Sequence, residues 1–170
     1  MRVLQLCCAL PWLAALSICV ACGEPARQTS ANVPVEVKRI VVQEGSGPVL
    51  ILQERQGSRW LPIWIGSGEA ESITRALEGR RARRPNTHDL ARNLLGALEV
   101  PVERCVITEL RADVYYARLV VRVRGEALEI DSRPSDAIAI ALRAEAPLFV
   151  HASLLAEEKK PAPSSSEREI

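Results

Sequence analysis

His88 and Asp89 are adjacent side chains that can carry out acid–base or metal chemistry. An imidazole can serve as a general base, and a carboxylate can bind a metal ion or orient the imidazole. A structural interpretation fits the same segment, because Asn86 or Thr87 is a good N-cap for a helix. With Asn86 as the cap, Asp89 falls at the third helical position and completes a capping-box-like pair. On spacing alone, the capping interpretation is favoured.

An arginine-rich segment comes directly before this pair, with four arginines within five positions: Arg80, Arg81, Arg83 and Arg84. Guanidinium groups suit phosphate oxygens, and the segment precedes a predicted helix, whose free N–H groups also favour anions. It is the one dense basic patch in the sequence and is therefore a candidate nucleic-acid-binding segment. The alternative, a solvated loop whose arginines pair with surface carboxylates, remains open.

A second candidate turn runs from Asp131 to Asp136 and holds two carboxylates, an arginine (Arg133) and serine hydroxyls. Magnesium or manganese takes oxygen ligands of this kind and can activate water for attack on a phosphodiester. Pro134, however, suits a first helical turn, and Asp136 near the third position suits the helix dipole. Without further information, capping is again the favoured interpretation.

A third candidate is the glycine-containing turn at 66–68, which opens another predicted helix. Glycine at such a turn lets a ligand approach the backbone closely, and Glu69 falls in the first helical turn. The turn is only a weak indicator of phosphate binding, because no Walker-type lysine follows it.

The composition excludes two ways of binding nucleic acid. The chain has 170 residues and a formal net charge of +1, so bulk positive charge does not attract a polyanion. Aromatic residues make up 4% and leave few rings for a base-stacking platform. Hydrophobic residues make up 48%, which is typical of one globular domain at this length. Contact with nucleic acid therefore has to come from a local patch.

The N-terminus resembles a bacterial lipoprotein export signal. Arg2 precedes an almost wholly apolar stretch from Val3 to Ala21. Small residues then precede Cys22, as in a lipobox, which predicts a lipidated Cys22 and a membrane-attached protein in the cell envelope, on the periplasmic side or at the outer membrane. A retained N-terminal membrane anchor is the alternative, since about nineteen apolar residues can just span a bilayer; a secreted protein is another.

The chain thus divides into a signal peptide (1–21), a tether (22–33), one folded domain (34–156) and a disordered Pro/Ser-rich tail (157–170). Apolar periodicity predicts seven strands and three helices in the domain. The predicted strands are Val33–Val42, Val49–Gln53, Trp60–Ile65, Val102–Leu110, Val114–Val123, Ala127–Ile130 and Leu148–Val150, and the helices are Glu69–Leu77, Thr87–Leu98 and Ser135–Ala144.

The order strand, strand, strand, helix occurs twice in this pattern. It predicts a compact α+β domain with a mixed or antiparallel sheet and a weak internal duplication. Exposed sheet edges favour a homodimer. Cys105 stands among apolar neighbours and is predicted to be a buried structural thiol.

Three segments together resemble the signature blocks of the bifunctional nuclease (BFN) domain family: Leu61–Gly66 with Glu69-Ala70, Arg84–Leu90 and Asp131–Ala139. The blocks come in the expected order, and the resemblance covers residues 35–155, essentially the whole predicted domain. The resemblance implies a compact α+β domain that is often dimeric. Plant members of the family are described as degrading both DNA and RNA.

For this chain the resemblance implies nuclease activity on DNA or RNA. His88 would act as general base or orienter, and Arg84 and Arg133 would hold phosphate. The predicted catalytic residues are His88, Asp89 and Asp136, and the predicted ligands of Mg²⁺ or Mn²⁺ are Glu69, Asp89, Asp131 and Asp136. The alternative is a non-catalytic, envelope-anchored binding module whose turns only cap helices. The export signal departs from the family pattern and would place a nuclease in the envelope.

Overall fold

The computed structural model describes residues 32–43, 47–80 and 82–157. The predicted signal peptide, Cys22, Arg81 and the tail beyond residue 157 lie outside these ranges. The first described strand begins at Asn32, slightly before the predicted start of the folded domain. In the described part of the chain, no helix is long and apolar enough to cross a membrane.

The order of strands and helices is the predicted one, and the boundaries differ from the prediction by a few residues at most. The α+β fold class is therefore confirmed. The described elements are β1 (Asn32–Gln43), β2 (Gly47–Glu54), β3 (Trp60–Trp64), α1 (Ser67–Leu77), α2 (Thr87–Ala97), β4 (Val102–Arg111), β5 (Val114–Val123), β6 (Glu126–Ser132), α3 (Pro134–Arg143) and β7 (Leu148–His151), followed by a 3₁₀ turn (Ala152–Leu154).

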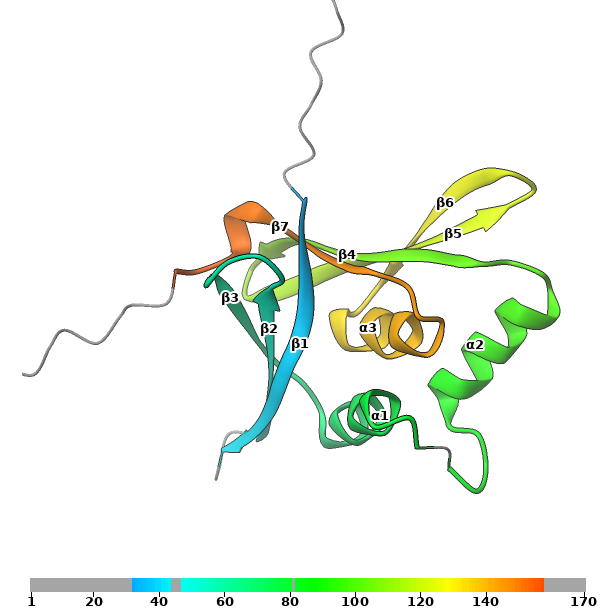
Figure 1. Cartoon of the computed structure of the whole chain (residues 1–170), viewed down its shortest axis with the longest axis horizontal. Helices are drawn as coiled ribbons and strands as arrows, with labels where there is room; N and C mark the ends of the chain where they lie inside the picture. Colours follow the sequence, from blue (N-terminus) through cyan, green and yellow to red (C-terminus); the bar gives the residue numbers. More distant parts are fainter. Residues whose placement is uncertain (1–31, 44–46, 81, 158–170) are drawn as a thin grey trace, which may run out of the picture.

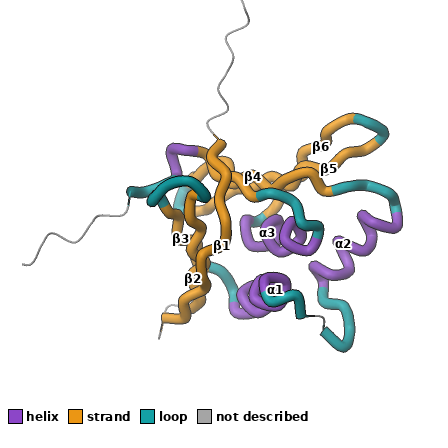
Figure 2. The backbone as a smooth tube through the Cα atoms, in the orientation of Figure 1, coloured by secondary structure: helices purple, strands orange, loops and turns teal. Residues whose placement is uncertain are grey.

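The described strands form one seven-stranded sheet in the order β3-β2-β1-β7-β4-β5-β6. Two antiparallel three-stranded meanders, β1–β3 and β4–β6, each precede a helix, which gives the repeated order predicted from the sequence. Strand β7 joins the two meanders, antiparallel to β1 and parallel to β4. Helices α1 and α3 pack against each other beside the curved sheet, while α2 lies towards one end of the domain (Figures 1 and 2).

The core lies between the sheet and α3, the most deeply buried helix. Its small and apolar side chains allow close packing, and Ala137, Ile138 and Ala139 have no exposed surface. Cys105 on β4 is also fully buried, and burial raises the pKa of its thiol to about 12. The prediction of a buried structural thiol at Cys105 is confirmed, and at neutral pH this thiol is protonated and unreactive.

Helix α2 contrasts with α3, because none of its described side chains is buried. Of its leucines, only Leu95 packs against the core. The exposed fractions of Leu90, Leu94 and Leu98 are 54%, 55% and 70%. Helix α2 is therefore attached through its first turn and Leu95, and its first turn carries His88 and Asp89.

Candidate functional site

The first turns of α2 and α3 meet at a direct contact between His88 and Asp136. His88 Nε2 lies 3.1 Å from Asp136 Oδ1, although the two residues are 48 positions apart in the sequence. Helix α1 contributes Ser72, whose Oγ lies 2.9 Å from the other ring nitrogen, Nδ1. One side chain from each helix thus forms a continuous Ser72–His88–Asp136 chain of hydrogen bonds. This is the central feature of the candidate site.

The start of α2 is fixed by a full capping box. The side chain of Asn86 accepts a hydrogen bond from the Asp89 backbone N–H at 2.9 Å, and Asp89 Oδ2 accepts one from the Asn86 backbone N–H at 2.9 Å. The predicted capping role of Asn86 and Asp89 is confirmed. This cap holds His88, between the two, in a fixed direction.

The second oxygen of Asp89 is also occupied. Arg143, in the last turn of α3, donates from Nε to Asp89 Oδ1 at 2.5 Å. Burial acts to raise the pKa of Asp89, but the hydrogen bonds from Arg143 and the Asn86 backbone and the Arg143 charge together hold it below its ordinary value. Asp89 is therefore an ionised structural anchor between α2 and α3.

Ser72 is a buried polar residue with an exposed fraction of 3%. Its Oγ accepts hydrogen bonds from Asn86 Nδ2 and from Arg143 Nη2, both at 2.9 Å. Both of these groups are obligate donors, so they occupy the two lone pairs of the hydroxyl. The hydroxyl proton therefore points to its third neighbour, Nδ1 of His88.

This bonding pattern assigns the tautomer of His88. Because Nδ1 accepts a hydrogen bond from the Ser72 hydroxyl, the ring proton of the neutral imidazole resides on Nε2. Nε2 then donates to Asp136. His88 thus has both ring nitrogens engaged, and its role in this arrangement is to orient Asp136.

The tautomer is directly testable by ¹⁵N NMR of the histidine rings. We expect the His88 proton on Nε2 in the unmodified protein and a mixture of tautomers in Ser72→Ala, which removes the donor to Nδ1. Ser67→Ala is the matched control, because Ser67 is an exposed serine in the same helix. A proton on Nδ1 in the unmodified protein would contradict the assignment.

Arg133, the N-cap residue of α3, holds the other side of Asp136. It donates from Nε to Oδ2 at 2.8 Å and from Nη2 to Oδ1 at 3.0 Å, and Nη2 also donates to Glu69 Oε1 at 2.9 Å. Burial acts to raise the pKa of Asp136, but hydrogen bonds from Arg133 and His88 and the Arg133 charge hold it below its ordinary value. Asp136 is therefore an ionised carboxylate of fixed orientation.

These side chains line a cavity of about 420 Å³ at the junction of the three helices. The side chains of His88 and Asp136 are partly exposed, at 14% and 27%, and that of Arg133 is 67% exposed. The cavity is therefore open to solvent on the Arg133 side. Its lining residues are Gly68, Glu69, Ser72, Asn86, Thr87, His88, Ala91, Arg133, Asp136 and Ile140.

The four carboxylates predicted as metal ligands take different positions. Glu69 and Asp136 lie in the cavity and are both bonded to Arg133, while Asp89 is turned towards Arg143. Asp131 is exposed on β6, opposite Arg118 on β5. Among the described residues, no three His, Cys, Asp or Glu side chains gather as a metal-binding group. Two carboxylates bridged by a guanidinium are not arranged to hold a cation, so the metal site stays a prediction.

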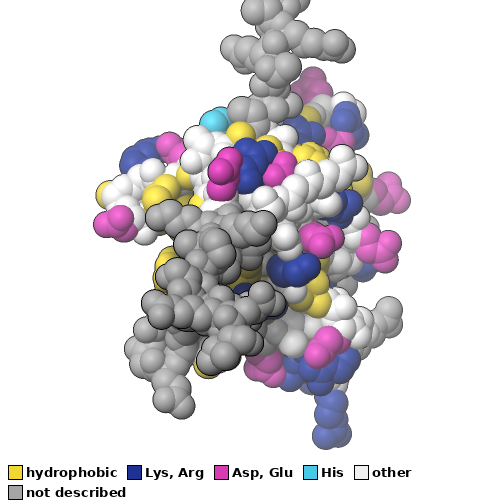
Figure 3. All heavy atoms as spheres, turned by 60° about the vertical axis from the view of Figure 1, so that its left-hand side comes forward, with side chains coloured by type: hydrophobic (Ala, Val, Ile, Leu, Met, Phe, Trp, Pro, Cys, Tyr) yellow, Lys and Arg dark blue, Asp and Glu magenta, His cyan; other side chains and the backbone are white. Residues whose placement is uncertain are grey.

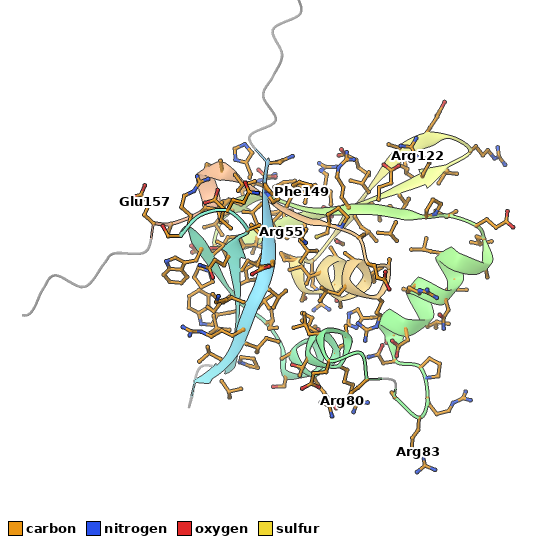
Figure 4. All side chains as sticks on the ribbon, in the orientation of Figure 1. Arg55, Arg80, Arg83, Arg122, Phe149 and Glu157 are labelled. Carbon is orange, nitrogen blue, oxygen red and sulfur yellow. The ribbon has the colours of Figure 1, made fainter. Side chains whose placement is uncertain are left out.

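The predicted basic segment forms the connection between α1 and α2. Arg80 pairs with Glu78, and Figure 4 shows Arg80 and Arg83 in this connection, with Arg83 pointing away from the helices. Arg84 is exposed and makes no ion pair within the described ranges. On the face in Figure 3, basic and acidic side chains lie interspersed. The segment is therefore accessible to an anion through Arg83 and Arg84.

Ser72 and Arg143 are the site residues that the sequence did not indicate. Ser72 occupies an ordinary mid-helix position, and Arg143 stands in the last turn of α3, where a cation also suits the helix dipole. Their contact joins positions 71 residues apart, so no local sequence pattern predicts it.

The fold and the site define a class: a compact α+β domain whose three helices surround a cavity lined by a contacting histidine and aspartate. The family model for the bifunctional nuclease domain matches residues 50–163, about two thirds of the chain, so the chain belongs to the bifunctional nuclease domain family. The resemblance of the three sequence blocks to this family is confirmed.

Relatives of known sequence agree with this assignment. An uncharacterized protein of Mycobacterium tuberculosis is 39% identical over 129 residues, which cover 76% of this chain and 77% of the relative. Bifunctional nuclease 1 of Oryza sativa subsp. japonica is 30% identical over 119 residues, which cover 66% of this chain and 36% of the rice protein. Bifunctional nuclease 2 of the same plant is 28% identical over 120 residues, 68% of this chain and 37% of that protein. The matched region is thus a minor part of each rice protein.

Proposed function

We propose that this protein hydrolyses phosphodiester bonds of DNA or RNA at the cavity formed by His88, Asp136 and Arg133. The observation that carries the proposal is the direct His88–Asp136 contact, made by two helix starts 48 residues apart and placed beside an exposed guanidinium. Membership of a family whose rice relatives are called bifunctional nucleases supports phosphodiesters as the substrate class.

Arg133 is the phosphate-binding residue in this proposal. A guanidinium carries five N–H donors, and the three bonds to Asp136 and Glu69 use only Nε and Nη2. Both Nη1 donors remain for a non-bridging phosphate oxygen, on a side chain that is 67% exposed. Arg84 is a further phosphate contact in the adjoining connection.

Asp136 is the proton acceptor in this proposal. A carboxylate offers about four lone-pair sites, and His88 and Arg133 occupy two on Oδ1 and one on Oδ2. The remaining site on Oδ2 can accept a proton from the attacking water as the water oxygen bonds to phosphorus. The P–O bond to the leaving sugar oxygen then breaks, and that oxygen takes a proton from solvent. Because His88 and Arg133 fix the carboxylate plane, the water is positioned as well as deprotonated.

We also propose, as the sequence predicts, that the hydrolysis uses a divalent cation, Mg²⁺ or Mn²⁺. When bound, it would supply a Lewis acid for a phosphoryl oxygen. Of the four predicted ligands, Glu69 and Asp136 lie in the cavity, where both are bonded to Arg133, and Asp89 and Asp131 lie outside its lining. Hydrolysis measured in EDTA and then with added Mg²⁺ or Mn²⁺ tests this part; full activity in EDTA would refute it.

The decisive experiment uses purified full-length protein and single- and double-stranded DNA and RNA. We expect hydrolysis that is lost in His88→Ala and retained in His151→Ala, which alters the other histidine, on β7. Activity that survives His88→Ala, or that separates from the protein on a second column, would refute the proposal. Binding without hydrolysis would instead favour the non-catalytic binding module.

We also propose, from the sequence alone, that the protein is lipid-anchored in the cell envelope through Cys22, which lies outside the described residues. The apolar stretch before Cys22 supports this location. Incorporation of a labelled fatty acid should be lost in Cys22→Ser. Labelling that persists in this variant would refute the anchor.

The homodimer is a further part of the proposal. Two surfaces support it: the exposed leucines on α2 and the free edge of β6. A second copy of the protein would cover either one. Analytical ultracentrifugation should show a dimer that Leu94→Lys dissociates. A monomer at all concentrations would refute it.

A further inference from the structure

A second cavity, of about 480 Å³, opens on the opposite side of the first turn of α2. Pro85 and Asp89 line this second cavity, whereas the intervening residues 86–88 line the first. The end of α1, the α1–α2 connection, α2 and the end of α3 all contribute to its wall. The two cavities are therefore separated by a single turn of one helix.

The charges of the second cavity favour an anion. Among the described residues, four guanidinium groups line it against two carboxylates, those of Asp89 and Glu145. The lining arginines are Arg75, Arg80, Arg92 and Arg143. Arg92 makes no ion pair within the described ranges, whereas Arg75 and Arg80 pair with exposed glutamates outside the cavity wall. Arg92 is thus available to bind an anion, and the ion pairs of Arg75 and Arg80 are weak because their partners are exposed.

The Arg143 side chain is held in a fixed position in the wall of this cavity. It is only 11% exposed, and it is held by Asp89, by the Ala139 carbonyl oxygen and by Ser72. A guanidinium held in this way loses little conformational freedom when a ligand binds. None of the described lining residues is aromatic, so the cavity offers no surface on which a base would stack.

We propose that this second cavity binds a phosphate group of the nucleic-acid backbone, at a position flanking the phosphate held by Arg133. The proposal rests on the proposed nuclease function and extends it to a strand that passes over the first turn of α2. Guanidinium forks match phosphate oxygens, and the lining has a formal excess of two positive charges. The cavity would recognise the backbone and leave the base sequence unread.

A chain of hydrogen bonds connects the two cavities. Arg143 lines the second cavity and donates from Nη2 to Ser72, which in turn contacts His88 in the first. Changing Arg143 would therefore disturb both cavities. Arg75 and Arg92 form no hydrogen bond or ion pair with Ser72, His88 or Asp136 and are the appropriate residues to alter.

The test uses full-length protein with the charge-removing variants Arg92→Gln and Arg75→Gln. Arg55→Gln is the matched control, since Arg55 is an exposed arginine in the turn after β2, away from Arg80 and Arg83 in Figure 4. The first probe is a phosphorothioate-linked hexanucleotide, which resists hydrolysis, and the second is inorganic phosphate. Binding is followed by fluorescence anisotropy and by NMR of the arginine Nε–H groups.

We expect the hexanucleotide to bind about three- to tenfold more weakly to each cavity variant, the value of one typical hydrogen bond. The slope of log K against log salt should fall by about 0.7 per lost contact, and KM for a cleavable strand should rise with kcat unchanged. Arg55→Gln should behave as unmodified protein. Shifts of the Arg92 Nε–H by the strand but not by phosphate alone would show that the site takes a backbone phosphate as part of a strand.

Equal binding by Arg92→Gln, Arg75→Gln and Arg55→Gln would overturn this inference even if the protein hydrolyses nucleic acid. Arginine shifts with free phosphate but none with the strand would also overturn it, because the site would then be one for a free anion. Strand binding lost in the cavity variants, in a protein with no hydrolytic activity, would support the second cavity and refute the nuclease proposal. The experiment therefore tests the second phosphate-binding cavity and the nuclease activity independently.

Discussion

Asp136→Asn is expected to lower the hydrolysis of DNA or RNA by about 10²- to 10⁴-fold, the usual contribution of a positioned acid–base group. The substitution preserves the shape of the side chain but removes the charge that accepts bonds from His88 and Arg133. The measurement is kcat/KM on a fluorescent oligonucleotide, with circular dichroism to show that the fold is retained.

Asp131→Asn is the matched control, because Asp131 is a second aspartate of the same sequence block but lies exposed on β6. We expect this variant to retain activity. If both substitutions abolish hydrolysis, the metal site predicted from the sequence is the better account of Asp131 and Asp136. If neither does, the reaction takes place elsewhere.

The pH dependence follows from the same carboxylate. Since the pKa of Asp136 is held below its ordinary value, the carboxylate stays ionised through the mildly acidic range. The acid limb of the kcat/KM profile should therefore lie below the usual aspartate pKa of about 3.9. A limb near pH 6–7 would contradict Asp136 as the proton acceptor.

Arg143→Met is expected to destabilise the domain by about 2–3 kcal/mol, because it leaves Asp89 and Ser72 without their shared donor. Methionine fills similar space, so the loss reports the polar contacts and not a cavity. For a domain of this size the midpoint of thermal unfolding should fall by about 10 °C. Arg92→Met, in which no such contact is lost, should change the midpoint little.

The effect of Arg143→Met should also depend on pH. The pKa of Asp89 is lowered in the folded protein, so the stability it contributes is present above its ordinary value near 3.9 and is lost as pH falls through the folded value. The difference between Arg143→Met and the unmodified protein should therefore be largest near neutral pH and shrink below pH 4. A difference that does not change with pH would contradict the role of the Asp89 charge.

The parts of the site that depend on local sequence were predictable. The N-cap at Asn86, the partner role of Asp89 and the helix start at Pro134 all follow from residue types a few positions apart. The strands and helices of the fold were predictable for the same reason, since apolar periodicity is a local signal.

The contacts between helices were not predictable in this way. The sequence left open whether His88 and Asp136 approach each other, and it gave no sign that Ser72 would lie under His88. Such contacts depend on how α1 and α3 pack, which is decided by burial of side chains such as Ile73 and Ile138 across the whole domain. Likewise, Leu90 and Leu94 recur at helical spacing, but periodicity does not say whether their face of the helix meets the core.

The late position of β7 in the sequence affects how the chain folds during its synthesis. Strand β7 is the next-to-last described element, yet it is the strand that pairs with both β1 and β4. Until it leaves the ribosome, the earlier residues can form only two separate three-stranded meanders, each with an unpaired inner edge. A chain that stops before Leu148 would thus expose two unpaired strand edges, which can pair with other protein molecules. The pairing of β7 with β1 and β4 removes both edges and so protects the completed chain from such association.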